Sequence, residues 1–166
     1  MEVLPNMKCA IIYASVHHGN TKKVLDTISN IYDIQLLDAT AGLNYDLSSF
    51  DLIGFASGIY FSKFHNAVMQ AVKNQLPTGK KVFFLYTCGA PAPTYLNDIR
   101  RAVKEKACAV IGEYHCLGYD TFGPFKLIGG IAKGHPNQEE LADAADFLNK
   151  MIHDAKDNEK QRQKMK

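Results

Sequence analysis

The stretch Ile11–Leu25 reads IIYASVHHGNTKKVL, and it determines how the chain folds. An apolar run that begins at Cys9 ends after Tyr13, and Thr21 opens a run with helical spacing. Most residues between them are small or can form hydrogen bonds. A strand that turns tightly into a helix leaves backbone N–H groups unpaired at the positive end of the helix. The stretch therefore predicts a turn between a strand and a helix that can bind a phosphate group.

The residues of this turn exclude two common nucleotide-binding motifs. No lysine directly follows Gly19 as in G-x-x-x-x-G-K-[ST], and G-x-G-x-x-G is absent. Gly19 lets the backbone approach a ligand closely, and the hydroxyls of Ser15 and Thr21 can donate to phosphate oxygens. These features fit a phosphomonoester. The alternative is an ordinary polar loop before a well-capped helix, because short turns of this kind are common.

The composition is that of one globular domain. The chain has 166 residues, of which 46% are hydrophobic and 22% are charged. No apolar run reaches the roughly 18 residues of a membrane-spanning helix, and the first residues lack the apolar core of a signal peptide. We therefore expect a cytoplasmic protein without a membrane span, and either a monomer or a weak dimer.

The cysteines argue against a metal site, and the charges argue against a nucleic acid partner. The four cysteines show neither C-x-x-C nor metal-binding spacing, so we expect no metal site. The basic balance of the chain comes from residues 156–166, and we treat these as a polar basic tail after a domain of residues 1–155. No aromatic residues are interleaved with the charges of the tail, so no nucleic acid partner is expected. Binding of the tail to nucleic acid or a membrane surface is the alternative to a solvated tail that is frayed or disordered.

Apolar runs and helical spacings alternate along the chain. Strands are predicted over Met7–Tyr13, Tyr32–Leu37, Leu52–Ala56, Lys81–Thr87 and Ala107–Leu117. Helices are predicted from Thr21, over His65–Leu76, after an N-cap at Thr94, and after a capping box of Asn137 and Glu140. This alternation is typical of a parallel sheet with right-handed crossovers.

Ligands of such sheets bind beyond the carboxyl ends of the strands. Three loops there mix glycine, hydroxyl and aromatic residues, namely Ser15–Thr21, Ser57–His65 and Thr87–Thr94. A fourth loop, Gly118–Phe125, follows the last strand. We expect these loops to meet at one site.

The chain resembles the flavodoxin family. The resemblance is carried by IIYASVHHGNT (11–21), FDLIGFASGIYFSKFH (50–65), YTCGAP (86–91) and GPFKLIGGIAKGHPNQEELADAADF (123–147). It implies an α/β fold, a three-layer αβα sandwich with a five-stranded parallel sheet of order 2-1-3-4-5. It also implies FMN as the cofactor.

The resemblance assigns residues to both ends of FMN. The phosphate would be held by Ser15, His17, His18, Gly19, Asn20 and Thr21. The ring would be bordered by Ser57, Gly58, Ile59, Tyr60 and Phe61 on one side and by Thr87, Cys88, Gly89 and Ala90 on the other. The first loop is one residue longer than S/T-x-T-G-x-T and has histidine where the family has threonine. Each histidine can therefore either contact the phosphate or be solvated.

The implied function is FMN-dependent electron transfer that cycles through a flavin semiquinone. Its partners would be a donor reductase and an acceptor enzyme, or a small-molecule acceptor. The alternative is an oxidoreductase that acts on a quinone or a protoporphyrinogen, because GIYFSKFH (58–65) also resembles the flavodoxin-like protoporphyrinogen oxidases. Such an enzyme would have a pocket over the ring lined by Tyr119, Phe122 and Phe125. A binding module that has lost its flavin is the third alternative.

The charges of the loops suggest one further property. Residues 15–21, 57–65 and 87–95 contain no aspartate or glutamate, whereas Lys63 is present. Flavodoxins surround their flavin with carboxylates, which disfavour a negatively charged reduced flavin. We therefore expect a less negative second reduction potential than is usual in that family, and a weaker attraction to basic partner proteins.

Overall fold

The structure is a computed structural model that describes residues 7–164. Its strands are β1 (Cys9–Ala14), β2 (Gln35–Asp38), β3 (Leu52–Tyr60), β4 (Lys63–Phe64), β5 (Lys81–Cys88) and β6 (Ala109–Leu117). Its helices are α1 (Asn20–Ile31), α2 (Asn66–Gln75), α3 (Asn97–Glu105) and α4 (Gln138–Lys164). Two short 3-10 helices, η1 (Ala39–Ala41) and η2 (Gly123–Ile128), complete the described elements.

Five of the strands form a parallel sheet in the order β2-β1-β3-β5-β6. This confirms the predicted order 2-1-3-4-5, because the additional strand β4 pairs only with β3, and in antiparallel fashion. The strands β1, β3 and β5 lie inside the sheet and are buried on both faces, as their continuous apolar runs predict. The carboxyl ends of the parallel strands therefore share one edge.

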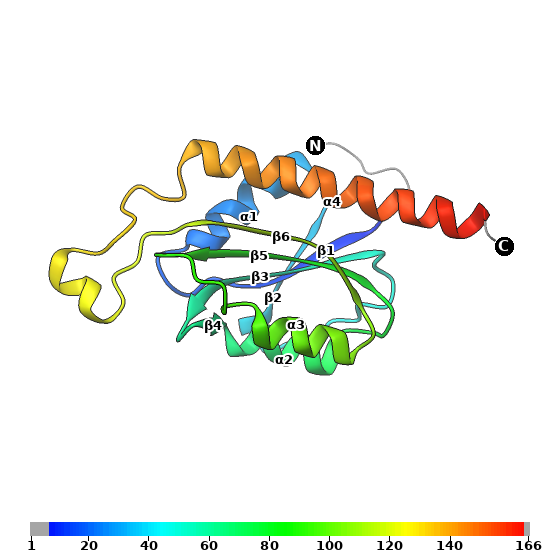
Figure 1. Cartoon of the computed structure of the whole chain (residues 1–166), viewed down its shortest axis with the longest axis horizontal. Helices are drawn as coiled ribbons and strands as arrows, with labels where there is room; N and C mark the ends of the chain where they lie inside the picture. Colours follow the sequence, from blue (N-terminus) through cyan, green and yellow to red (C-terminus); the bar gives the residue numbers. More distant parts are fainter. Residues whose placement is uncertain (1–6, 165–166) are drawn as a thin grey trace.

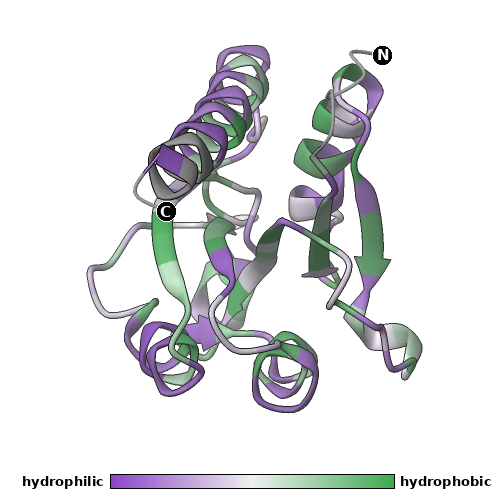
Figure 2. Cartoon of the chain, turned by 90° about the vertical axis from the view of Figure 1, so that its right-hand side faces the viewer, coloured by the Kyte–Doolittle hydropathy of each residue, from purple (hydrophilic) through white to green (hydrophobic). Residues whose placement is uncertain are grey.

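Helices cover both faces of the sheet, which gives the predicted three layers (Figure 1). One core lies between the sheet and α1 and α4, and it contains Ile11, Leu25 and Leu148. The other lies between the sheet and α2 and α3, and it contains Phe55 and Val72. Figure 2 shows the sheet edge-on, with apolar strands between helices whose outer faces are polar.

The predicted capping box starts the last helix. The backbone N–H of Glu140 donates to Asn137 Oδ1 at 2.9 Å, and the N–H of Asn137 donates to Glu140 Oε2 at 2.8 Å. These two bonds satisfy donors that would otherwise be unpaired at the start of the helix. The helix continues to Lys164, so most of the predicted polar tail prolongs α4. No helix within residues 7–164 has the length and apolar character that crossing a bilayer requires.

Several predicted boundaries were wrong. β3 does not end at Ala56 but continues to Tyr60, because its last residues pair with β4; the loop predicted over 57–65 is largely a hairpin. Thr94 is not the N-cap of α3, which begins at Asn97 after a turn in which the Asn97 N–H donates to the Thr94 carbonyl. β2 begins at Gln35 and not at Tyr32, because Tyr32 is the C-cap of α1 and its N–H donates to the Ile28 carbonyl.

Candidate functional site

A cavity of about 280 Å³ lies at the carboxyl edge of the sheet. Four loops line it, as the sequence predicts for a parallel sheet. Its walls are formed by His17, Asn20, Gly58, Ile59, Tyr60, Phe61, Ser62, Thr87, Cys88, Gly89, Ala90, Tyr95, Gly118, Tyr119, Asp120, Phe122 and Phe125. Within residues 7–164 there is no group of histidine, cysteine and carboxylate side chains that could hold a metal ion.

The first loop turns β1 into α1 through two consecutive left-handed residues. His18 has a φ of 54° and Gly19 a φ of 66°. Among the described residues, no acceptor is bonded to the backbone N–H groups of His17, His18 and Gly19. The Ser15 hydroxyl accepts from the Lys22 N–H at 3.0 Å and so caps α1. The loop therefore presents free donors at the positive end of a helix, which suits an anion.

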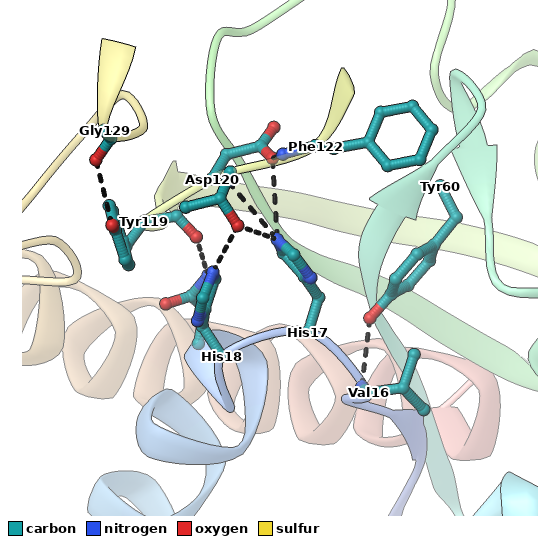
Figure 3. Close-up of polar contacts among 10 residues, drawn as sticks. Val16, His17, His18, Tyr60, Tyr119, Asp120, Phe122 and Gly129 are labelled. Carbon is teal, nitrogen blue, oxygen red and sulfur yellow. Dashed lines mark hydrogen bonds and ion pairs between the residues drawn. The ribbon is translucent and has the colours of Figure 1, made fainter. Parts of the chain in front are cut away.

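The histidines of this loop face the segment that follows β6 (Figure 3). The Nε2 atom of His18 lies 2.8 Å from Thr121 Oγ1, and the Nε2 atom of His17 lies 3.7 Å from Asp120 Oδ1. The Asn20 amide donates to the Tyr119 carbonyl at 2.8 Å. These side chains therefore attach the first loop to the fourth, a role that the sequence did not predict for them.

The second loop also contacts the first. The Tyr60 hydroxyl accepts a hydrogen bond from the Val16 N–H at 3.0 Å (Figure 3). Tyr60 lies so close to Gly58 that a Cβ atom there would be 2.9 Å from the Tyr60 oxygen. The Ser57 hydroxyl is buried, donates to the Gly58 carbonyl and accepts from the His65 N–H. Ser57 thus fixes the shape of this loop from beneath, whereas Gly58 and Tyr60 line the cavity.

The tip of the β3–β4 hairpin closes one side of the cavity. Phe61 and Ser62 have φ values of 49° and 63°, and positive φ at both positions is what a two-residue hairpin turn of type I′ requires. The Phe61 ring meets the Phe122 ring edge to face, with their centroids 5.1 Å apart. This aromatic pair joins the second loop to the fourth at the mouth of the cavity.

The third loop supplies the wall next to β5. Burial, together with the nearby Asp120 carboxylate, raises the pKa of the Cys88 thiol to about 11, so this thiol is protonated at neutral pH. The Tyr95 hydroxyl donates to the Ala90 carbonyl at 3.0 Å and fixes the loop. Gly89 is required here, because a Cβ atom would lie 2.8 Å from the Asp120 side chain.

Asp120 is a charged residue of the site to which the sequence analysis assigned no role; Ser62, Tyr95 and Gly118 also line the cavity without having been assigned. It belongs to the fourth loop and lines the cavity. Its backbone pairs with that of Ile131 through two hydrogen bonds. The sequence analysis counted charges in the first three loops only, and the fourth loop adds the Asp120 carboxylate to the site. The Lys63 ammonium is bound to Asp98 at 3.0 Å, so the cation that we counted near the site is paired.

Glu140 anchors both ends of the segment between β6 and α4. One carboxylate oxygen accepts from the Leu117 N–H at 3.1 Å, and the other lies 2.8 Å from His135 Nδ1. Burial opposes ionisation of this carboxyl, but the hydrogen bonds from Asn137, His135 and Leu117 outweigh it and lower the Glu140 pKa. The neck of the fourth loop is thereby held in place beside the cavity.

The predicted site residues divide into two groups. Those that line the cavity are His17, Asn20, Gly58, Ile59, Tyr60, Phe61, Thr87, Cys88, Gly89 and Ala90. Ser15, His18, Gly19, Thr21 and Ser57 lie behind or beside it. Thr21 is buried, and its hydroxyl is 2.8 Å from that of Thr87, so it supports the wall of the cavity.

A family model described as a flavodoxin domain matches residues 10–118. The match runs from β1 to the end of β6 and includes the first three loops of the cavity. The chain belongs to the flavodoxin family. An uncharacterized protein of Methanocaldococcus jannaschii is 35% identical to this flavodoxin-family chain over 148 residues, which are 88% of this chain and 99% of the relative.

Solved structures show the same flavodoxin fold. A flavodoxin from the domain Archaea superposes with a TM-score of 0.66 at 17% identity and covers 90% of this chain and 99% of its own. A Fusobacterium nucleatum flavodoxin mutant bound to flavin mononucleotide has a TM-score of 0.60 at 16% identity, with 89% and 96% covered. General stress protein 14 of Treponema denticola, in complex with FMN, has a TM-score of 0.61 at 12% identity, with 87% and 99% covered.

The Thr21–Thr87 hydroxyl pair gives a test of how the first and third loops are joined. Replacing Thr21 by Val leaves the buried Thr87 hydroxyl unpaired and should lower the free energy of unfolding by about 1–3 kcal/mol. Replacing both by Val removes both polar groups, so the double variant should lose less than the sum of the two single losses. Chemical denaturation of the four proteins measures this. Strictly additive losses would contradict the pairing.

Proposed function

We propose that this protein binds FMN and acts in the cytoplasm as an electron-transfer protein. The observation that carries the proposal is the position of the cavity. It lies between the free N–H groups at the start of α1 and a set of aromatic side chains at the carboxyl edge of the sheet. A nucleotide with a phosphate at one end and a planar ring at the other matches both features.

The residues of the site fit this cofactor. The N–H groups of His17, His18 and Gly19 are donors without acceptors among the described residues, and they suit a phosphate dianion. The ring would lie in the aromatic part of the cavity, where Gly58 and Gly89 keep the backbone accessible. FMN, when bound, supplies one- and two-electron redox chemistry.

The chain itself contributes charge and enclosure to this site. The Asp120 carboxylate places negative charge at the cavity wall, and its Oδ1 atom lies 3.7 Å from His17 Nε2. The Phe61 and Phe122 rings contact each other at the mouth of the cavity. Charges interact more strongly beside a partly desolvated cavity than in bulk water, so Asp120 is well placed to influence how readily electrons are accepted.

A small-molecule oxidoreductase is the second candidate. The specific observation in its favour is that Tyr119, Phe122 and Phe125 all line the cavity, where they could also contact a planar substrate such as a quinone or a protoporphyrinogen. The carrier is preferred because the flavodoxin-domain match runs over residues 10–118 and includes three of the four loops of the cavity. A donor reductase and an acceptor enzyme are its proposed partners.

Binding of FMN and of riboflavin tests the cofactor assignment. Riboflavin lacks the phosphate, so it forgoes the charge-assisted hydrogen bonds of the first loop and should bind about a hundredfold more weakly or worse. Quenching of flavin fluorescence during titration of the apoprotein gives both dissociation constants. Equal affinity for the two flavins, or no binding of FMN, would overturn the proposal.

Replacement of Asp120 by Asn tests the charge at the cavity wall. Removing this negative charge should raise the reduction potential of bound FMN by on the order of tens of millivolts, because electrons would enter a less negative site. The matched control is Asp98→Asn, since Asp98 is an exposed carboxylate that binds Lys63 and does not line the cavity. Spectroscopic redox titration of the three proteins measures the shifts. A shift in Asp120→Asn no larger than in the control would refute the assigned role.

A further inference from the structure

The segment from Gly118 to Pro136, which begins with the fourth loop and is called the fourth loop from here on, carries an apolar surface that the proposed function does not use. The 3-10 helix η2 projects from the body of the protein at the carboxyl edge of the sheet (Figure 1). On it, Leu127 is 89% exposed and Ile128 is 73% exposed. Phe122, at the start of the same loop, is 55% exposed. Apolar side chains that are this accessible on a projecting loop mark a surface that interacts with another protein or with a membrane.

Phe61 extends this surface to the second loop. It is 79% exposed and stands at a left-handed position of the hairpin turn, where asparagine or glycine is the usual residue. Its ring contacts Phe122. We call Phe61, Phe122, Leu127 and Ile128 the apolar tip.

Between residues 121 and 138 the charged side chains have one sign. Lys126 and Lys133 are exposed there, and no aspartate or glutamate occurs in this range. Beside Phe61, on the hairpin, Lys63 is paired with Asp98. The Asp120 carboxylate lies in the neck of the loop, accepts from the Phe122 N–H at 2.7 Å, and lines the cavity. The outer surface of the loop is therefore apolar and cationic, which is complementary to a negatively charged lipid surface.

The backbone of the loop is suited to an apolar environment. The Phe125 N–H donates to the Phe122 carbonyl, and the Gly130 N–H donates to the Phe125 carbonyl at 2.7 Å. The Gly129 N–H donates to the Lys126 carbonyl at 3.3 Å. The loop thus satisfies several of its own polar groups, and this lowers the free-energy cost of leaving water.

We infer that the apolar tip docks this protein on the surface of an anionic lipid bilayer. Insertion at the interface needs only a few apolar side chains together with basic residues that meet the headgroups. The charges favour lipid as the occupant, because two exposed lysines can meet anionic headgroups and residues 121–138 contain no carboxylate side chain. Phe122 belongs to both the apolar tip and the cavity wall, so docking would bring the mouth of the cavity to the lipid surface.

Cosedimentation of the full-length protein with vesicles tests this inference. The protein should bind vesicles of phosphatidylcholine mixed with phosphatidylglycerol, and it should bind pure phosphatidylcholine vesicles more weakly. Leu127→Asp/Ile128→Asp should lower the partition coefficient by at least about tenfold, because two exposed apolar side chains become charged. Lys126→Gln/Lys133→Gln should remove the preference for anionic vesicles. The assay needs no bound FMN, so its result is independent of the cofactor proposal.

Two control variants distinguish the apolar tip from apolar and basic residues elsewhere on the protein. Leu43→Asp also changes an exposed leucine, but its carbonyl accepts from Gln75 at the far end of α2, so binding should be unchanged. Lys160→Gln/Arg162→Gln/Lys164→Gln tests the basic end of the chain, and binding should again persist. The inference is overturned if the protein binds no vesicles, if the Leu127/Ile128 variant binds as the parent does, or if only the Lys160/Arg162/Lys164 variant loses binding. It is also overturned if light scattering shows a dimer that the Leu127/Ile128 variant dissolves.

Discussion

The geometry of the site depends on how β1 turns into α1. β1 is buried on both faces and ends at Ala14, and α1, which covers the sheet, begins at Asn20. The chain makes this turn by placing His18 and Gly19 in the left-handed region. That conformation leaves backbone donors free at the start of α1, beside the carboxyl ends of the strands, and the cavity lies there.

Hydrogen bonds join each of the other three loops to this turn or to the first residues of α1. Val16 binds Tyr60 of the second loop, Thr21 pairs with Thr87 of the third, and Asn20 binds the Tyr119 carbonyl of the fourth. Each bond joins residues far apart in the sequence, so the cavity exists only when the whole sheet is assembled. The first loop therefore both offers donors to a ligand and holds the walls of the cavity together.

The sequence predicted most of the framework and part of the site. Apolar runs identified the five parallel strands, and the capping box of Asn137 and Glu140 was confirmed. The β3–β4 hairpin was missed because its turn, Phe61-Ser62, lacks the glycine or asparagine that signals such a turn. The loop that contains Asp120 was predicted at the site, but the position of its carboxylate was not, because that depends on a backbone pairing with Ile131 and on contacts with His17, more than a hundred residues earlier in the chain. Residues placed by local periodicity were predictable, and those placed by contacts between loops, the histidines among them, were not.

The most direct test of the phosphate site is a comparison of amide NMR spectra of the isotope-labelled protein with and without FMN. We predict that the backbone N–H signals of His17, His18 and Gly19 move strongly when FMN is added, because their free donors bind the phosphate. Riboflavin should leave these three signals near their original positions. FMN that shifts signals elsewhere while these three stay in place would contradict the central claim.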